Sequence, residues 1–126
     1  MNATARYVID HVYPAAASLL LPAMDTPTAW RQITAIGLQE SRFQYRRQVR
    51  GPARGFWQFE RGGGVTGVLT HTNTAAIAAG VCHVLGYEPT AQAIYDALAD
   101  NDVLSACFAR LLLWTDARAL PTTQVD

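Results

Sequence analysis

Apolar residues recur three and four positions apart along most of this chain, which is the period of an amphipathic helix. The alternation of apolar and polar residues that is typical of strands is weak throughout. Thr26 and Pro27 suit a helix start, whereas Gly86 suits a helix end. We therefore predict an all-α fold with helices over residues 3–21, 27–41, 65–70, 73–85, 89–99 and 102–114, the first of them kinked or divided at Pro14.

Length and composition suit one hydrophobic core. The chain has 126 residues, half of them hydrophobic, so we expect residues 1–126 to form a single domain. No apolar run reaches the roughly 20 residues that span a bilayer, so membrane insertion is not expected. Residues 1–13 mix charged with apolar positions and do not have the pattern of a secretory signal.

Glu40 lies on the apolar stripe of the second predicted helix, in step with Ile33 and Ile36. We expect its carboxyl group to point inward, where loss of water would raise the pKa. A carboxylic acid that stays protonated near neutral pH can donate a proton to a leaving oxygen. The structural alternative is a buried glutamate that pairs with one of the arginines that follow it.

Residues 42–64 form an irregular segment between two helical regions, punctuated by Gly51-Pro52, Gly55 and Gly62-Gly63-Gly64. It contains the aromatic run Phe56-Trp57-Gln58-Phe59. Aromatic rings stack on the apolar faces of sugars and amides bind their hydroxyl groups, so this run is a candidate ligand surface. The alternative is that the three rings fill the core.

All ten basic residues are arginines, and six of them fall between positions 42 and 61, although the net charge is zero. The six are Arg42, Arg46, Arg47, Arg50, Arg54 and Arg61. This segment predicts either a surface for an anionic partner or a solvated loop whose arginines pair with acids from the C-terminal half. Nucleic-acid binding is the less favoured reading of the same arginines, because no nucleic-acid motif accompanies them.

The spacing of several residues resembles the signature of lytic transglycosylases and goose-type lysozymes. A Glu-Ser pair closes a helix and is followed by an aromatic residue and by a glycine, two apolar residues, a glutamine and another apolar residue. The matching positions are Glu40, Ser41, Phe43, Gly55, Gln58 and Phe59. The resemblance is specific from about residue 33 to residue 59, and the sequence departs from the family pattern at residues 100–103.

The resemblance implies a lysozyme-like fold with a glycine-rich, aromatic active-site loop. It implies that Glu40 is the catalytic acid/base for cleavage of the β-1,4 MurNAc–GlcNAc bond of bacterial peptidoglycan. Ser41 would be structural or would orient the sugar, and the cleft would be shaped and lined by residues of the loop. With Ser41, the expected substrate-binding residues are Gly55, Phe56, Trp57, Gln58 and Glu60. Neither a metal nor a cofactor is expected.

Two mechanisms remain open. A transglycosylase needs one carboxyl group, whereas most glycosidases use two, about 5–9.5 Å apart. Glu60 is the nearby second carboxylate, and its neighbours suggest a surface position, so the single-glutamate scheme is favoured. A third reading is a non-catalytic, glycan-binding component of a phage particle.

The expected partners are peptidoglycan strands and, for a phage protein, other virion proteins. We expect synthesis in the cytoplasm and action on the cell wall, with delivery in a phage particle or by release through a membrane pore. Cys82 and Cys107 are expected to be buried free thiols, or a disulfide if their helices pack together. The three histidines have no metal-ligand spacing.

Overall fold

The computed structural model describes residues 2–116, and the all-α prediction is confirmed for them. No strand forms within these residues, which contain two isolated bridges in the irregular segment. The elements, in chain order, are α1 (Ala3–Tyr7), the π-helical turn η1 (Val8–Val12), α2 (Tyr13–Ala17), the 3₁₀ turn η2 (Pro22–Met24), α3 (Pro27–Glu40), the π-helical turn η3 (Arg61–Val65), α4 (Thr66–Thr70), α5 (Ala75–Leu85), α6 (Ala91–Leu98) and α7 (Asp102–Trp114).

The first predicted helix is continuous through Pro14 but shorter than expected. The turn before the proline is widened, since the Tyr13 N–H donates to Val8 O, five residues back. A wider turn relieves the clash between a proline ring and the carbonyl group of the preceding turn. The helix ends at Ala17, and two single turns follow, in which Leu19 and Leu20 bond three residues back.

The predicted start of α3 is confirmed, and its end lies one residue before the predicted one. The Thr26 side chain accepts a hydrogen bond from Ala29 N, Pro27 takes the first helical position, and Glu40 is the last residue. Asn101 caps α7 in the same way, by accepting from Leu104 N. Local chemistry therefore fixes both helices that border the candidate site.

Two other helix starts differ from the prediction by one or two residues. Helix α5 begins at Ala75 behind Thr74, rather than at residue 73, and the Thr74 hydroxyl group donates to Val68 O at 2.7 Å instead of capping the helix. Helix α6 begins at Ala91 behind the cap Thr90, rather than at Pro89. Gly86 ends α5 with a positive φ of 86°, as predicted.

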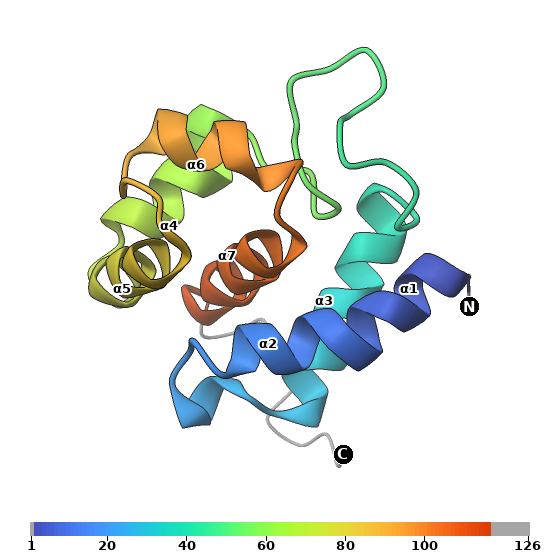
Figure 1. The fold of residues 1–126 in the computed structure, drawn as a ribbon, viewed down its shortest axis with the longest axis horizontal. Helices are drawn as coiled ribbons and strands as arrows, with labels where there is room; N and C mark the ends of the chain where they lie inside the picture. Colours follow the sequence, from blue (N-terminus) through green and yellow to red (C-terminus); the bar gives the residue numbers. More distant parts are fainter. Residues whose placement is uncertain (1, 117–126) are drawn as a thin grey trace.

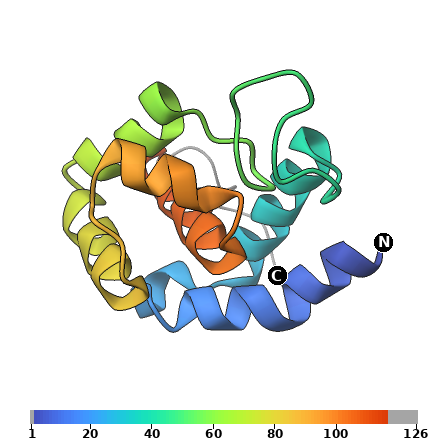
Figure 2. The same cartoon turned by 45° about the horizontal axis from the view of Figure 1, so that its top comes forward.

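Helix α7 lies at the centre of the molecule and the other elements surround it (Figures 1 and 2). Eight consecutive α7 residues, Leu104 to Leu111, are buried. The rod formed by α1, η1 and α2 runs along one side of α7, while α4, α5 and α6 cover another (Figure 1). The buried apolar side chains of all these elements form one cluster. Leu112, the residue after this buried run, is 39% exposed.

Cys82 and Cys107 are buried free cysteines, as expected, although α5 and α7 pack together. Burial raises the pKa of the Cys107 thiol to about 12. Among residues 2–116, no single helix is long and apolar enough to cross a membrane. The segments Arg61–Thr70 and Ala75–Leu85 would qualify together by length and composition, with a bend of 104° between them.

Candidate functional site

The chain reverses direction directly after Glu40, and Ser41 holds this reversal in place. The Ser41 hydroxyl group donates to Gly37 O at 3.3 Å and accepts from Phe43 N at 3.1 Å. Arg42 and Phe43 take left-handed backbone conformations, with φ of 56° and 52°. The Phe43 ring then packs directly on Gly37, where a Cβ atom would lie 2.3 Å from Cζ of the ring. This turn fixes where the last residue of α3 projects.

A second tight turn, at residues 54–59, faces the end of α3. The Arg54 N–H donates to Phe59 O, and the Phe59 N–H donates to Arg54 O, at 2.8 and 2.9 Å. Gly55 and Gln58 have positive φ values of 75° and 55°. A Cβ atom at Gly55 would lie 2.7 Å from the Ser105 Oγ, so both the conformation and the space favour glycine.

The three rings of the aromatic run are largely buried and serve the packing of this turn. Trp57 Nε1 donates to Ile33 O at 2.8 Å and so joins the turn to α3. Phe56 is 1% exposed and lies beneath the Arg46 guanidinium group, 4.4 Å from the ring centroid. The interpretation of core-filling rings therefore holds for Phe56, while Trp57 and Phe59 also form part of a cavity wall.

Two adjacent cavities lie between the end of α3 and the turn, and Glu40, Gln58 and Glu60 line both of them. The first has a volume of about 520 Å³ and a mainly apolar wall made by Ile33, Ile36, Trp57, Phe59, Leu112 and Leu113. The second, of about 330 Å³, is lined on its other side by Tyr45, Gln48, Val49 and Ala53. We refer to the two cavities together as the groove.

Glu40 lies in the groove but does not point inward. The residue is exposed, so the expectation of a carboxyl group withdrawn from water is wrong. The reason is that α3 extends past the core at its C-terminal end, where Leu38 and Gln39 are exposed as well. Ile33 and Gly37 on the apolar stripe of α3 are buried, but one turn later no other part of residues 2–116 covers this face of the helix.

Glu60 is exposed, as its neighbours suggested, yet it also lines both cavities beside Glu40. Its carbonyl group accepts hydrogen bonds from Gly63 N and Val65 N, so the start of η3 fixes its backbone. Gln58 is half-buried, and its amide nitrogen donates to Gly55 O at 2.9 Å. The structure therefore brings together Glu40, Gln58 and Glu60, three of the residues that the sequence singled out.

Three of the expected substrate contacts are not accessible from the groove. Ser41, Gly55 and Phe56 are buried and line neither cavity. Ser41 and Gly55 hold the two turns described above, and Phe56 fills the core. Ser41 thus fits the structural role that was one of its two alternatives, and Gly55 shapes the cleft, whereas contact of these three residues with a ligand stays a prediction.

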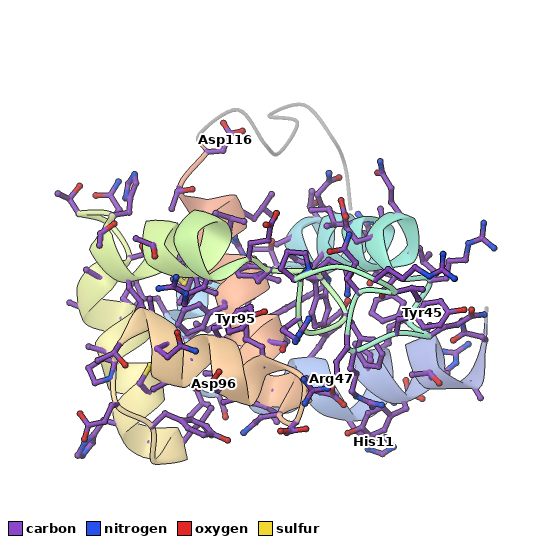
Figure 3. The ribbon with its side chains drawn as sticks, turned by 90° about the horizontal axis from the view of Figure 1, so that it is seen from above. His11, Tyr45, Arg47, Tyr95, Asp96 and Asp116 are labelled. Carbon is purple, nitrogen blue, oxygen red and sulfur yellow. The ribbon has the colours of Figure 1, made fainter. Side chains whose placement is uncertain are left out.

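Asp116 is a groove residue that the sequence did not indicate. It lies just beyond the end of α7 (Figure 3) and lines the first cavity together with Leu113 and Thr115. No helical pattern or motif covers this position, which follows the C-cap of α7. With Asp116, three carboxylates line the groove, and its lining residues include no arginine, lysine or histidine.

Two of the six clustered arginines are bound within the protein. Arg46 makes a two-pronged ion pair with Asp102, with both N–O distances at 2.9 Å, and this hydrogen bonding raises the pKa of Arg46. Arg54 donates to Gly51 O and Ala53 O and lies over the Tyr95 ring. The expectation of pairing with C-terminal acids is thus met by Arg46.

Arg42, Arg47, Arg50 and Arg61 are exposed. None of their side chains has a hydrogen-bond or ion-pair partner within residues 2–116. Their positive charges are therefore not paired with any acidic side chain in the described part of the chain.

The described part of the chain contains no group of three or more His, Cys, Asp or Glu side chains placed to hold a metal ion. No known protein-family model matches the chain, and no curated protein and no solved structure shows significant similarity to it.

Proposed function

We propose that the groove binds a glycan strand of bacterial peptidoglycan and that Glu40 acts as the acid/base that cleaves it, in a lysozyme-like manner. The observation that carries the proposal is the meeting of Glu40 with Gln58 and Glu60 between two adjoining cavities. A carboxyl group at the junction of two cavities is suited to a bond that joins two bound sugar units. The Glu-Ser and Gly-x-x-Gln-Phe signature of residues 40–59 supports the same assignment.

The composition of the walls suits sugars. The apolar wall with Trp57 and Phe59 offers a surface for sugar faces and acetyl methyl groups. Gln58, Tyr45 and Gln48 supply amide and hydroxyl groups for the ring substituents on the other side. Such a mixture of apolar surface and few polar groups is typical of small-molecule and cofactor sites.

The chemistry needs one proton donor that later becomes an acceptor. Glu40 gives its proton to the glycosidic oxygen as the bond between that oxygen and C1 breaks, while the N-acetyl oxygen of the substrate stabilises the positive charge at C1. The O6 hydroxyl group of the same sugar then bonds to C1, and Glu40 takes the O6 proton. The product is a 1,6-anhydro end, and no water is consumed.

Hydrolysis is the competing outcome, and the place of Glu60 makes it a specific one. Because Glu60 lines both cavities with Glu40, it could activate a water molecule or stabilise the charge at C1, as the second carboxylate of ordinary glycosidases does. The product would then be a reducing end.

The experiment is digestion of purified peptidoglycan by the wild type and by Glu40→Gln and Glu60→Gln, with mass spectrometry of the released fragments. Glu88→Gln, at an exposed site between α5 and α6, is the matched control for the loss of one glutamate. We expect Glu40→Gln to lose at least about 100-fold in rate, the scale of general acid–base catalysis. Glu88→Gln should retain the wild-type rate.

The products decide between the mechanisms. Anhydro ends made at similar rates by the wild type and Glu60→Gln support the single-glutamate scheme. Reducing ends, together with a large loss in Glu60→Gln, support hydrolysis with two carboxylates. Cleavage by Glu40→Gln at the wild-type rate overturns the proposal.

A non-catalytic role in glycan binding is the second candidate, because the exposed Glu40 is not desolvated in the free protein. On this view the protein holds the strand, as a component of a phage particle would, without cutting it. Retention of the protein on intact peptidoglycan, with no released fragments from the wild type, would favour this function over cleavage.

A further inference from the structure

The basic part of the irregular segment is a distinct surface feature. Residues 42–54, which we call the arginine loop, contain five arginines and no acidic residue. The loop stands out from the helices beside the end of α3 (Figures 1 and 2). Arg46 is neutralised by Asp102, while Arg42, Arg47 and Arg50 are exposed without partners among residues 2–116.

The groove next to this loop has the opposite charge. Its lining includes Glu40, Glu60 and Asp116 and no basic side chain. The loop nevertheless forms one wall of the second cavity, through Tyr45, Gln48 and Val49. A ligand that fills the groove is therefore in contact with the loop. The positive and negative regions are distinct, since Arg47 of the loop and Asp116 of the groove lie well apart (Figure 3).

Neighbouring regions of opposite charge bind different parts of a ligand that carries both neutral and anionic groups. Carboxylates repel like charges and so disfavour anionic groups within the groove, whereas arginine forks bind carboxylate groups outside it. A neutral sugar backbone with anionic side groups matches this division. A uniformly anionic polymer does not, because its backbone would meet the carboxylates of Glu40 and Glu60.

We infer that the arginine loop is a docking surface for the carboxylates of the peptide substituents that a peptidoglycan strand carries outside the groove. This inference rests on the proposed function, since it assumes that the groove holds the sugar backbone of the same strand. It adds a second element of recognition, which draws the anionic strand toward the protein and aligns it along the groove.

The loop is held in shape, which suits docking. Gln48 N donates to Ala53 O at 2.9 Å, and the Gln48 side chain accepts from Ala53 N at 3.1 Å. The Gly55 N–H donates to Arg46 O, and the Tyr95 hydroxyl group of α6 donates to Pro52 O. A loop that is fixed beforehand loses less conformational freedom on binding than a mobile one.

The test compares the double variant Arg47→Gln/Arg50→Gln with Arg6→Gln/Arg31→Gln. The second is a control that also removes two positive charges, but from α1 and α3. All proteins carry Glu40→Gln so that cleavage does not dissolve the polymer. Binding is measured by sedimentation with purified peptidoglycan sacculi and with chitin, a neutral glycan, over a salt range of about 20–300 mM. Melting curves establish that both double variants are folded.

We expect the loop variant to bind sacculi about tenfold more weakly than the control at low salt, with the difference shrinking as salt rises. The loss on chitin should be much smaller than the loss on sacculi. An equal loss in both double variants would mean that only net charge matters, and would overturn the inference. An equal loss on sacculi and chitin would do the same.

Two further polyanions complete the test. Duplex DNA and phosphatidylcholine vesicles that contain phosphatidylglycerol are assayed with the same proteins. Tighter loop-dependent binding to either one than to sacculi overturns the assignment in favour of that partner. Failure of the proposed cleavage is recognised separately in the digestion experiment, where it appears as no fragments released by the wild type, and this outcome leaves the arginine comparison intact.

Discussion

Helix α7 and residues 41–60, which form the irregular segment between α3 and η3 in the structure, both bury large side chains, but the hydrogen-bonding groups of their backbones are satisfied in different ways. In α7 the backbone bonds to itself, so eight consecutive residues are buried with little dependence on side-chain detail. In the segment, Phe43, Phe56 and Trp57 are buried on a backbone without regular structure. There the backbone hydrogen bonds belong to separate turns, such as the Arg54–Phe59 pair, and side chains such as Ser41 and Gln48 supply further ones.

The difference explains where the groove lies. A self-contained helix such as α7 contributes a wall, through Leu112 and Leu113, but few polar groups. The irregular segment supplies Gln58 and Glu60 because its turns direct side chains that no helix could place together. We expect the segment to be the more sensitive of the two regions to single substitutions, and the following experiments test this, from the largest expected effect to the smallest.

Trp57→Ala should be the most destabilising change. It removes a side chain that is 4% exposed and its hydrogen bond to Ile33 O, so we expect a loss of about 3–5 kcal/mol in the free energy of unfolding. Trp114→Ala, at a residue of α7 that is 36% exposed, is the matched control and should cost about 1 kcal/mol. Urea denaturation measures both, and similar losses would remove the proposed contrast.

Gly55→Ala tests the tight turn of the segment. The substitution adds a Cβ atom 2.7 Å from Ser105 Oγ at a φ of 75°, and we expect a loss of about 2–4 kcal/mol. Gly86→Ala, at the end of α5, has a φ of 86° and no atom within 4 Å of the new Cβ, so it should cost only about 1–2 kcal/mol. Equal losses would show that the close contact with α7 is not important.

Cys107 in α7 makes the free energy of unfolding depend on pH. Its folded pKa of about 12 lies above the ordinary value of 9.0, so below pH 9 the thiol is protonated in both states. As the pH rises from 9 toward 12, the Cys107 thiol ionises only in the unfolded state. This stabilises the unfolded state and lowers the free energy of unfolding. By about pH 11 the wild type should lose about 2 kcal/mol more than Cys107→Ala does.

Unfolding free energies measured in urea from pH 8 to about pH 11 would show this loss. Val84→Ala, at an exposed position without a titratable group, should follow the wild type at a constant offset. A parallel pH dependence in Cys107→Ala and the wild type would contradict the prediction.

Asp102→Asn should have the smallest effect, because the ion pair with Arg46 joins the two regions at the surface. Arg46 is 45% exposed, so solvent screens the pair and we expect a loss of about 0.5–1 kcal/mol, reduced at high salt. Asp96→Asn on α6 is the control, since that carboxylate accepts from Gln92 within its own helix. A larger loss in the control would show that the pair does not fasten the loop to α7.

Much of the helical architecture could be predicted from the sequence because local groups decide it. Thr26, Pro27 and Gly86 mark helix ends by backbone chemistry that needs no distant partner. The candidate site was predicted in part, since Glu40, Gln58 and Glu60 do meet. The helical pattern of α3 could not reveal that Glu40 is exposed, because periodicity does not show where the covering protein ends.

The amino-acid sequence by itself determined the starts of α3 and α7, the end of α5, the glycine-dependent turn at Gly55 and the concentration of arginines in one segment. Tertiary structure alone decided which rings are buried, that Asp116 joins the groove, and which arginines keep an unpaired charge. The physical reason is distance: caps and turns act over a few residues, whereas the groove and its charges arise from elements far apart in sequence that pack around α7.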